Sequence, residues 1–501
     1  MHLIKLLEAI EEINVNRDST MIDIHITGIA VDSRKVEKGN LFIAISGYET
    51  DGHKYIEDAV KRGAVAVIGE HQTINTTVPL FIVKNSREAL GKISSMFYNY
   101  PSKKHKVIGI TGTNGKTTTS YLLKHILEAA GKSCSLIGTV SYIINGEVYK
   151  PTNTTPDALQ IQTLLSKSED EFFIMEISSH ALKQSRIEGI GLDYGIFTNL
   201  SHDHLDYHET MEQYFEDKSI MFNHLKEDGK AIINEICPWG KRLAKKLHIP
   251  IRTLGSQSFE VHNEDNKKDG YHGCILKDIQ LQGKVNFTLC MNGENYKIFY
   301  PFPGLHNIYN AAIAFLTAVE MGIEPMVVIK ALASFRGAPG RFEIIHHPSG
   351  AIFVVDYAHT KDAFEHCLNS AKQQGAKRIT HIFGFRGARD SSKRVDMVKT
   401  SAKHCDAVLL TLDDLNGVSE NEISEELVNL NLYHCRGKGK VQLDRTLAIQ
   451  QAWETAEEGD WVFITGKGLE EYDREFTLPA RSDKEVILLL KENDKTEEKI
   501  I

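Results

Sequence analysis

The stretch from Lys106 to Ser120 constrains the fold of this chain more than any other. Val107–Ile110 is a β-branched run with the composition of a buried strand. Gly112 and Gly115 interrupt it, and the next residues lead into a helix whose apolar face lies within 122–127. This order of strand, glycine loop and helix predicts a phosphate-binding loop in an α/β domain.

The residue types in this loop suit a nucleotide phosphate group. Glycines let successive backbone N–H groups point at one anion, and the N-terminus of the helix adds partial positive charge. Lys116 fits the residue that reaches the terminal phosphates, and Thr117 fits the magnesium ligand. The full P-loop pattern has a glycine where this chain has Ile110, so a plain structural turn is the alternative. The predicted phosphate-loop residues are Thr111, Gly112, Thr113, Asn114, Gly115, Lys116, Thr117 and Thr118.

Length and composition limit the class of protein. The 501 residues predict about three domains, and 42% hydrophobic and 25% charged residues are typical of a globular protein. The net charge is −9 and no block of basic residues occurs, so we expect neither nucleic acid nor a membrane as a partner. The seven cysteines form no CxxC pair, which favours reduced thiols over disulfides or a zinc site. We expect a cytoplasmic protein, because no signal segment or 18-residue apolar run is present. We also expect a monomer.

The distribution of apolar runs predicts three α/β domains. Residues 1–103 alternate short strands and helices and form a small α/β domain. Residues 104–340 carry near-continuous apolar runs typical of a parallel sheet, with antiparallel hairpins between about 250 and 300. Residues 341–501 repeat the pattern as a second, doubly wound domain similar to a Rossmann fold. Its four expected strands lie near 352–356, 379–384, 408–411 and 461–466.

Polar residues at the ends of the central strands are candidates for the site. Glu176 ends one apolar run and Thr198-Asn199 ends another, and parallel strands place such residues at one edge of the sheet, beside the phosphate loop. A carboxylate in that position suits magnesium, which prefers hard oxygen ligands. Capping of the following helix is the alternative for Glu176.

Three further polar features have open interpretations. The segment 199–208 holds three histidines and two aspartates among its last seven residues, which suits a transition metal, a single histidine on magnesium, or a solvated helix start. The composition around Lys218 predicts that it is a surface lysine. Arg341 either binds phosphate once domains close or forms an interdomain salt bridge.

Taken together, these motifs resemble the Mur ligase family of ATP-dependent amide-bond synthetases, and most closely its MurE type. The matching stretches span nearly the whole chain in family order. They are VDSRKVEKGNLFIA (31–44), DGHKYI (51–56), TGTNGKTTT (111–119), NTTPD (153–157), MEISSHAL (175–182), TNLSHDHLDYH (198–208), the helix of Lys218, GLHNIYNAA (304–312), APGRFE (338–343), VVDYAHT (354–360) and GKGLE (466–470).

The resemblance implies roles for individual residues. The first domain would bind the UDP end of a UDP-N-acetylmuramoyl peptide, with Ser33 near uridine. ATP would be held by the phosphate loop together with Asn307 at adenine, Arg341 at the phosphates and Asp356 at the ribose. Two magnesium ions would be bound by Thr117, Glu176, His204 and a carbamylated Lys218. The acceptor peptide would be positioned by Asn153, Thr154, Thr155, Ser178, Gln184 and Arg186, and the incoming amino acid by Arg389, Asp413, Asn416, Gly466 and Glu470.

The implied reaction joins an amino acid to the D-glutamate carboxylate of UDP-N-acetylmuramoyl-L-Ala-D-Glu through an acyl phosphate, in peptidoglycan precursor synthesis. Lys116, Lys218, Glu176 and His204 would be the catalytic residues. One alternative is a ligase of the same fold acting on another acceptor peptide. The other is a nucleotide-binding paralogue without catalysis.

The third domain departs from the family. Enzymes of the MurE type that add meso-diaminopimelate carry Asp-Asn-Pro-Arg, where this chain has Asp413-Asp414-Leu415-Asn416, so the arginine that would bind the distal carboxylate is missing. Leu469 replaces a histidine, and Phe385 and Arg386 stand where the family has small residues. We therefore expect an amino acid other than meso-diaminopimelate. Asp413, Asp414 and Glu470 suit an amine such as that of lysine, and Leu415 and Leu469 suit a less polar side chain.

Overall fold

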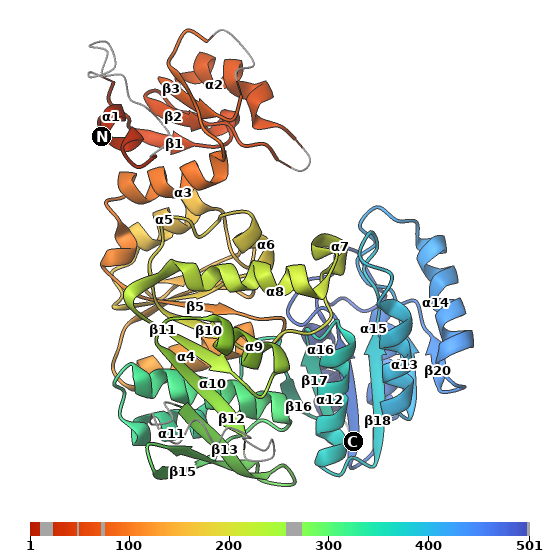
Figure 1. The fold of residues 1–501 in the computed structure, drawn as a ribbon. Helices are drawn as coiled ribbons and strands as arrows, with labels where there is room; N and C mark the ends of the chain where they lie inside the picture. Colours follow the sequence, from red (N-terminus) through yellow and green to blue (C-terminus); the bar gives the residue numbers. More distant parts are fainter. Residues whose placement is uncertain (11–23, 48–49, 72–75, 257–272, 498–501) are drawn as a thin grey trace. The chain divides into compact units, whose positions relative to one another are not determined.

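A computed structural model describes residues 1–10, 24–47, 50–71, 76–256 and 273–497 (Figure 1). The described chain forms two compact units. The first comprises Met1–Thr111, Lys132–Ile196 and Glu216–Ala231, and the second comprises Gly112–Gly131, Phe197–Phe215 and Ile232–Ile501. The helix α8 (Met211–Ser219) and the strands β10 (Leu192–Phe197) and β11 (Leu225–Asn234) run across the division.

The N-terminal part of the first unit is a small α/β domain, as predicted. Its four strands pair in parallel in the order β1-β2-β3-β4. Alternate apolar residues of β2 and β3 form a buried core with Leu3, Leu6, Leu90 and Ile93, and the others pack in a second core with the residues of α2. The elements are α1 (Leu3–Leu7), β1 (Gly28–Ala30), β2 (Asn40–Ile43), α2 (Ile56–Arg62), β3 (Ala66–Gly69), β4 (Leu80–Ile82) and α3 (Ser86–Phe97), with 3-10 turns at Ser33–Lys35, Gly52–Tyr55 and Pro101–Lys103.

The rest of the first unit carries the parallel sheet expected for the central domain. Strand β5 (Lys106–Thr111) lies between β10 and β9 (Phe172–Glu176), and β9 in turn pairs with β6 (Cys134–Ile137). Isoleucine and valine side chains of β5 are fully buried, in agreement with the predicted buried strand. The remaining elements are β7 (Tyr142–Ile144), β8 (Glu147–Tyr149), α5 (Ala158–Lys167), α6 (Ser179–Lys183) and a 3-10 turn at Ile220–His224.

In the second unit, the helix that follows the phosphate loop packs against two later helices. The apolar face of α4 (Lys116–Ala129) is fully buried, and α4 contacts α10 (Leu305–Glu320) and α11 (Pro325–Ser334). The predicted hairpins are present: β13 (Gly273–Gln280), β14 (Asn286–Met291) and β15 (Glu294–Phe299) pair antiparallel. The same unit contains α7 (Leu205–His208), α9 (Pro238–Lys246) and β12 (Ile251–Ser256).

The C-terminal part of the second unit is the predicted doubly wound domain. Five strands are parallel in the order β17-β21-β18-β19-β20, and β16 pairs antiparallel at the edge. All four strands expected here are observed, each within two residues of its predicted bounds. The elements are β16 (Glu343–His346), β17 (Ile352–Asp356), α12 (Lys361–Gln373), β18 (Arg378–Phe383), α13 (Arg394–His404), β19 (Ala407–Leu410), α14 (Glu420–His434), β20 (Gly439–Val441), α15 (Arg445–Glu454), β21 (Asp460–Thr465) and α16 (Asp483–Glu497).

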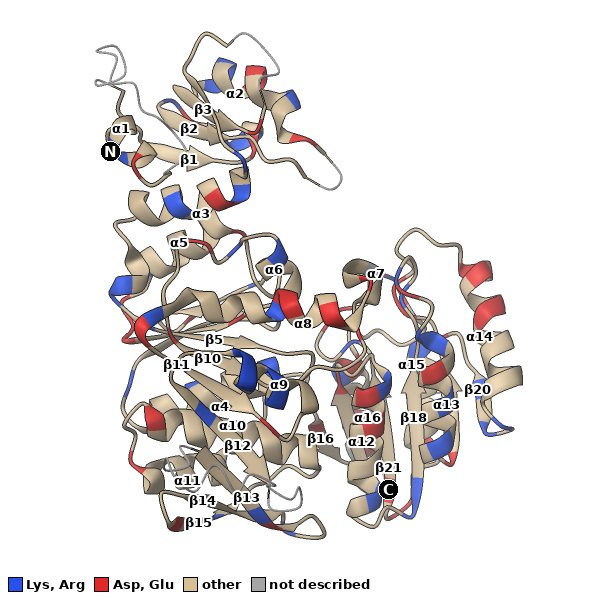
Figure 2. Cartoon of the chain, viewed as in Figure 1, with Lys and Arg blue, Asp and Glu red and all other residues tan. Residues whose placement is uncertain are grey.

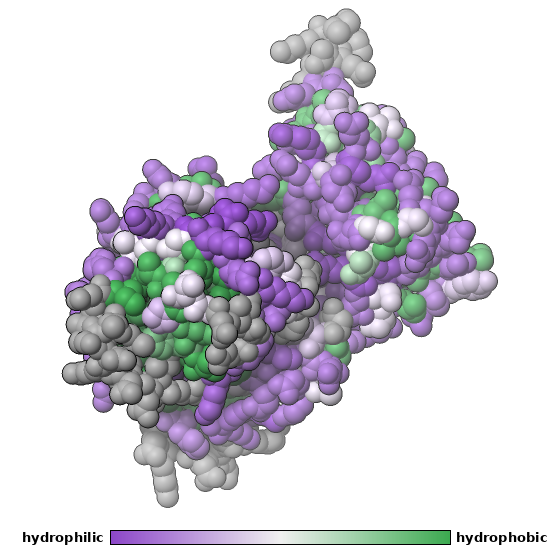
Figure 3. All heavy atoms as spheres, turned by 90° about the horizontal axis from the view of Figure 1, so that it is seen from above, coloured by the Kyte–Doolittle hydropathy of each residue, from purple (hydrophilic) through white to green (hydrophobic). Residues whose placement is uncertain are grey.

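Surface properties agree with the composition. Charged residues of both signs are interspersed along the chain (Figure 2), and hydrophilic residues cover most of the face in Figure 3. All seven cysteines are free thiols, as expected. None of the described helices is both long and apolar enough to cross a membrane. The mixed α/β, three-domain fold class is confirmed, and the boundaries near residues 103 and 340 stay predictions.

Candidate active site

The phosphate loop depends on two glycines. Gly112 has φ +147°, and a Cβ atom there would lie 2.0 Å from Thr198 Oγ1. Gly115 has φ +86°, and a Cβ atom there would lie 2.3 Å from Asn310 Oδ1. A side chain at either position would therefore have to displace a neighbouring polar group, which explains why glycine occupies both. The usual P-loop pattern has its first glycine at the position of Ile110. In this loop the backbone conformation and the close contact with Thr198 require the glycine at position 112 instead.

The end of β10 holds the phosphate loop, as the sequence predicted for Thr198-Asn199. The backbone N–H of Thr113 donates to the carbonyl of Asn199 at 2.9 Å, and the N–H of Asn114 donates to its Oδ1 at 3.0 Å. The hydroxyl of Thr198 donates to the carbonyl of Asn114 at 2.7 Å. These contacts hold the loop backbone against the end of β10.

Two cations lie at the start of α4. Lys116 Nζ donates to the carbonyls of Gly112 and Thr113 at 2.8 and 3.0 Å. Arg341 Nη2 donates to Thr117 Oγ1 at 3.3 Å, and its guanidinium lies 4.3 Å from the ring centroid of Tyr357. Arg341 is therefore next to the phosphate loop, and no salt bridge of Arg341 is found among the described residues.

A cavity of about 390 Å³ adjoins the loop. Asn307 lies in it and donates to the carbonyl of Pro303 at 2.8 Å. Asp356 also lies in it, fully within the protein, and burial raises the pKa of its carboxyl, although Arg341 acts in the opposite direction. The Asp356 carboxylate accepts the backbone N–H groups of Phe342 and Ala358, each at 2.6 Å. The three residues predicted to contact ATP outside the loop thus meet around the loop and this cavity.

Glu176 ends β9 and its side chain is completely buried. Its Oε2 accepts the hydroxyl of Thr139 at 2.9 Å, and its Oε1 accepts the N–H of the same residue at 3.3 Å. The N-cap of the following helix is Ser178, which accepts from Ala181 N–H at 3.2 Å. Helix capping, the alternative role for Glu176, is therefore performed by Ser178.

The histidine-rich segment is organised by Asp203. Its carboxylate lies 3.3 Å from Lys393 Nζ, 3.4 Å from His204 Nε2 and 4.0 Å from His359 Nε2. Burial alone would raise the pKa of Asp203, but His204, His359 and Lys393 together hold it well below its usual value. The side chain of His204 is 44% exposed, in a backbone conformation with φ +54°.

Lys218 is not the surface residue that composition suggests. Its side chain is 1% exposed, although it lies on α8 among charged neighbours. A buried lysine costs free energy unless its charge is balanced or removed. The expectation from composition was wrong because one lysine does not alter the spacing of hydrophobic residues along a helix. The role as a carbamylated magnesium ligand, which the family resemblance implies, is consistent with a buried position.

The residues predicted to position the acceptor peptide come together in the first unit. Arg186 Nη1 donates to the carbonyl of Thr155 at 2.7 Å, and its Nη2 donates to Gln184 Oε1 at 2.8 Å. The N–H of Ser178 donates to Thr155 Oγ1 at 3.0 Å, and Thr139 Oγ1 lies 3.1 Å from Thr154 Oγ1. A cavity of about 570 Å³ is lined by Asn153, Gln184 and Arg186 together with Asp32 and Arg87.

Ser33 lies near this cavity but is buried. It is 5% exposed, and its hydroxyl hydrogen-bonds to the carboxylate of Asp58, which lowers the pKa of that carboxyl. Its neighbours Asp32 and Lys35 line the cavity instead.

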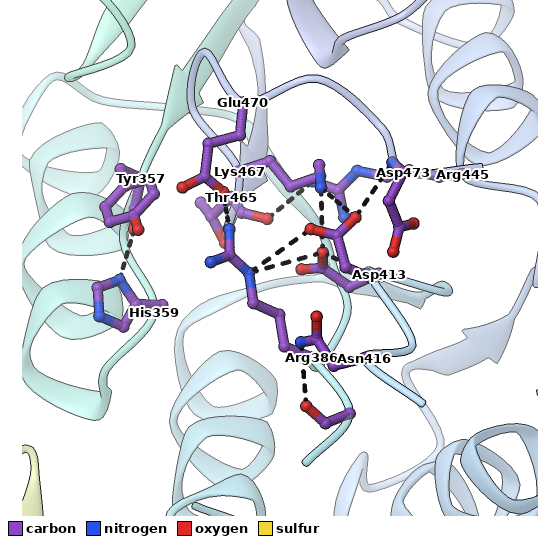
Figure 4. Close-up of polar contacts among 12 residues, drawn as sticks. Tyr357, His359, Arg386, Asp413, Asn416, Arg445, Thr465, Lys467, Glu470 and Asp473 are labelled. Carbon is purple, nitrogen blue, oxygen red and sulfur yellow. Dashed lines mark hydrogen bonds and ion pairs between the residues drawn. The ribbon is translucent and has the colours of Figure 1, made fainter. Parts of the chain in front are cut away.

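Two of the residues predicted to position the incoming amino acid, Asp413 and Glu470, lie in a charged cluster at the ends of β18, β19 and β21 (Figure 4). Lys467, which is 1% exposed, places Nζ 2.5 Å from Asp414 Oδ1 and 3.4 Å from Asp413 Oδ1. Burial favours the neutral acid, but the hydrogen bond and charge of Lys467 outweigh it and lower the pKa of Asp414. Arg386 pairs with Glu470 and lies 3.9 Å from Asp413 and 4.0 Å from Asp414.

A third cavity, of about 210 Å³, opens beside this cluster. Arg386, Arg389, Asp413 and Gly466 line it, as do Asp203 and His204. Asn416 is not among the lining residues, and its amide donates to the carbonyl of Gly387 at 3.1 Å. Asn416 therefore holds the neighbouring loop, while Arg389, Asp413 and Gly466 line the cavity. Glu470 does not line it and pairs with Arg386 instead.

Comparison with known proteins identifies the family. Residues 25–98 match the model described as Mur ligase family, catalytic domain, residues 110–318 match the Mur ligase middle domain, and residues 340–468 match the Mur ligase glutamate ligase domain. The chain is 37% identical over 475 residues to a UDP-N-acetylmuramoyl-L-alanyl-D-glutamate–2,6-diaminopimelate ligase of Syntrophomonas wolfei, covering 93% of this chain and 95% of that protein. The chain belongs to the Mur ligase family.

Other relatives of this Mur ligase agree. A protein of Aquifex aeolicus with the same name is 37% identical over 459 residues and covers 91% of each chain. A solved structure of an enzyme with that name superposes with a TM-score of 0.68 at 27% identity, over 98% of this chain and 99% of that one. The crystal structure of a MurF ligase from Thermotoga maritima shares the fold, with a TM-score of 0.60 at 20% identity, over 88% and 94% of the two chains.

Sequence reasoning missed several residues that the structure places in the site. Arg386 and Lys467 were seen only as parts of glycine-rich motifs, and Lys393 and Thr139 were not singled out at all. Arg386 stands in a segment that departs from the family, which was the available sign. The pairing of Lys393 with Asp203 joins residues far apart in sequence, so no local pattern could predict it.

Proposed function

We propose that this Mur ligase is an ATP-dependent ligase that joins the D-glutamate carboxylate of UDP-N-acetylmuramoyl-L-Ala-D-Glu to the amine of a free amino acid. It would act in the cytoplasm, as a monomer, in peptidoglycan precursor synthesis. The observation that carries this proposal is the phosphate loop with Lys116 and Arg341 at its helix end, next to a cavity of nucleotide size. The names of its relatives support the acceptor.

The chain's own groups suit the activation step. The acceptor carboxylate attacks the γ-phosphorus of ATP, the bond to the ADP oxygen breaks, and an acyl phosphate forms with ADP as the leaving group. Lys116 would leave its loop carbonyls to bind the transferring phosphoryl group, and Arg341 would add a second positive charge. The N-terminus of α4 would add partial positive charge at the same phosphate group. Asp356 and Asn307 would hold the ribose and the adenine in the cavity.

Thr117, Glu176, His204 and Lys218 are the residues proposed to hold magnesium. Their donors fit: Glu176 offers a buried carboxylate, Thr117 a hydroxyl, and a carbamylated Lys218 would offer a second hard-oxygen group. Two bound ions would neutralise charge on the phosphates.

Carbamylation of Lys218 is directly testable. Incubation of the protein with ¹³C-bicarbonate is expected to give a carbamate carbonyl resonance in the carbon NMR spectrum, because a buried amine is protected from rapid exchange with solvent. The Lys218→Arg variant should lack this resonance. The Lys230→Arg variant, which changes a partly exposed lysine, should keep it. A spectrum of the parent protein without the resonance would contradict the proposal for Lys218.

The second half of the reaction forms the amide. The amine nitrogen attacks the acyl carbon, a tetrahedral intermediate forms, and inorganic phosphate leaves with its bonding electron pair as the amine loses a proton. Thr154, Thr155, Ser178, Gln184 and Arg186, with Asn153, would hold the acceptor peptide. Arg389 would bind the α-carboxylate of the amino acid in the cavity that it lines with Asp413 and Gly466.

We further propose that the chain divides into three domains, at residues 1–103, 104–340 and 341–501.

The ligase proposal predicts consumption of a defined acceptor. With ATP, magnesium, UDP-N-acetylmuramoyl-L-Ala-D-Glu and a mixture of amino acids, we expect stoichiometric release of ADP and phosphate and a new UDP-muramoyl product by mass spectrometry. With meso-diaminopimelate alone we expect the rate to fall at least about tenfold, since no arginine stands where its distal carboxylate would bind. An acceptor left unchanged by every amino acid would refute the proposal.

A further inference from the structure

Three carboxylates gather where the incoming amino acid would bind. Asp413 and Asp414 follow β19, and Glu470 follows β21. Strand β18 pairs in parallel with both β19 and β21, so the carboxyl ends of these strands share one edge of the sheet. A cluster of this kind would ordinarily attract an ammonium group at the end of an amino-acid side chain.

This chain already supplies cations to those carboxylates. Lys467 is buried between Asp413 and Asp414, and Arg386 pairs with Glu470 (Figure 4). Arg386 also lies within 4.0 Å of both aspartates, so its guanidinium joins all three acids into one network. The negative charge that would hold a second amine is therefore largely balanced within the protein.

Arg386 also has the position needed to meet a substrate. Its side chain lines the 210 Å³ cavity and is 25% exposed, whereas Lys467 lies behind it at 1% exposure. Tyr357 lies on the same cavity, with its ring centroid 5.9 Å from the Arg386 guanidinium. An amino acid in the cavity would therefore contact the guanidinium rather than a free carboxylate.

We propose that Arg386 determines the choice of amino acid by closing the carboxylate cluster to a second ammonium group, so that the enzyme adds an amino acid whose side chain carries no positive charge. The inference rests on the proposed ligase function and names its substrate class. A cationic side chain would have to break the pair of Arg386 with Glu470 and then lie next to the freed guanidinium, and like charges at such a distance are strongly unfavourable.

Pairs of amino acids that differ in one ammonium group test this directly. We expect kcat/KM to be at least about a hundredfold higher for norleucine than for lysine, and for 2-aminopimelate than for meso-diaminopimelate, in a phosphate-release assay. The Arg386→Gln variant removes the charge and keeps a shorter polar side chain, so it should reduce this preference at least about tenfold. The Arg386→Lys variant keeps the charge and should keep the preference.

The outcomes separate the inference from the proposed function. Acyl phosphate is trapped by hydroxylamine without any amino acid, so hydroxamate formation reports activation alone. If hydroxamate forms and lysine is used as well as norleucine, the role of Arg386 is refuted while the ligase proposal stands. If no hydroxamate forms in the parent protein, the ligase proposal fails and the inference fails with it. The comparison of lysine with norleucine in the parent protein tests the proposed substrate class even if a variant does not fold.

Discussion

Replacing Lys116 with alanine is expected to lower ATP-dependent phosphate release by about a thousandfold, because the amine is proposed to stabilise charge on the transferring phosphoryl group. The fold should survive, since the loop backbone that Lys116 Nζ contacts is also held by Asn199. Hydroxamate formation from the acceptor measures the activation step without an amino acid.

A matched variant on the same helix controls for indirect effects. Lys124 lies two turns further along α4, where its 13% exposed side chain pairs with the exposed Glu128. Lys124→Ala should keep at least about half of the activity, because an ion pair between residues four apart on a helix contributes little to stability. Retention of more than a tenth of the activity by Lys116→Ala would contradict the role assigned to this lysine.

The second large effect concerns stability of the C-terminal domain. Arg445 and Asp483 form an ion pair in which both side chains are completely buried, with Nε–Oδ1 and Nη2–Oδ2 distances of 2.6 and 2.7 Å. Tyr472 donates to the same carboxylate at 2.8 Å, and Arg445 also donates to the carbonyl of Thr465 at 2.9 Å. The charge of Asp483 raises the pKa of the Arg445 guanidinium despite burial.

Asp483→Asn is expected to lower the free energy of unfolding of this domain by about 4 kcal/mol, because it leaves a buried guanidinium without its counter-charge. Two of the three tryptophans, Trp453 and Trp461, lie in the core of this domain, so tryptophan fluorescence in a urea titration follows its unfolding. The control is Lys403→Ala, which removes an exposed ion pair with Glu365 and should change stability by less than about 1 kcal/mol. Equal midpoints for the two variants would contradict the prediction.

The same pair connects stability to the site. Arg445 holds the carbonyl of Thr465, the last residue of β21, and the next residues are Gly466 and Lys467 of the amino-acid cavity. A loss of the pair is therefore expected to disturb the charged cluster as well as the core.

Local patterns in the sequence predicted much of the fold. The phosphate loop, α4 and the strands of the C-terminal sheet follow from short apolar runs and from glycines, whose effects are confined to neighbouring residues. The edge of the sheet where Thr198 and Asn199 meet the loop was predicted correctly, because parallel strands align their carboxyl ends. The resemblance to the family supplied the roles of the residues, which composition alone does not contain.

Other features depend on residues far apart in sequence. The burial of Lys218 gives no periodic signal, so composition placed it wrongly at the surface. The three acids at 413, 414 and 470 were predicted to be available to an amine, but the structure pairs them with Lys467 and Arg386. Such pairing depends on how the ends of three strands come together in space, and local sequence patterns do not contain that information.

The strand order of the C-terminal sheet has a consequence for synthesis of the protein on the ribosome. Strand β21 lies between β17 and β18, yet it is the last strand of the chain. Until residues near 465 have emerged, β17 and β18 each present an open edge and an uncovered apolar face. A nascent chain that stalls before this point would hold an unfinished sheet, so the C-terminal domain can complete its folding only after residues near 465 have left the ribosome.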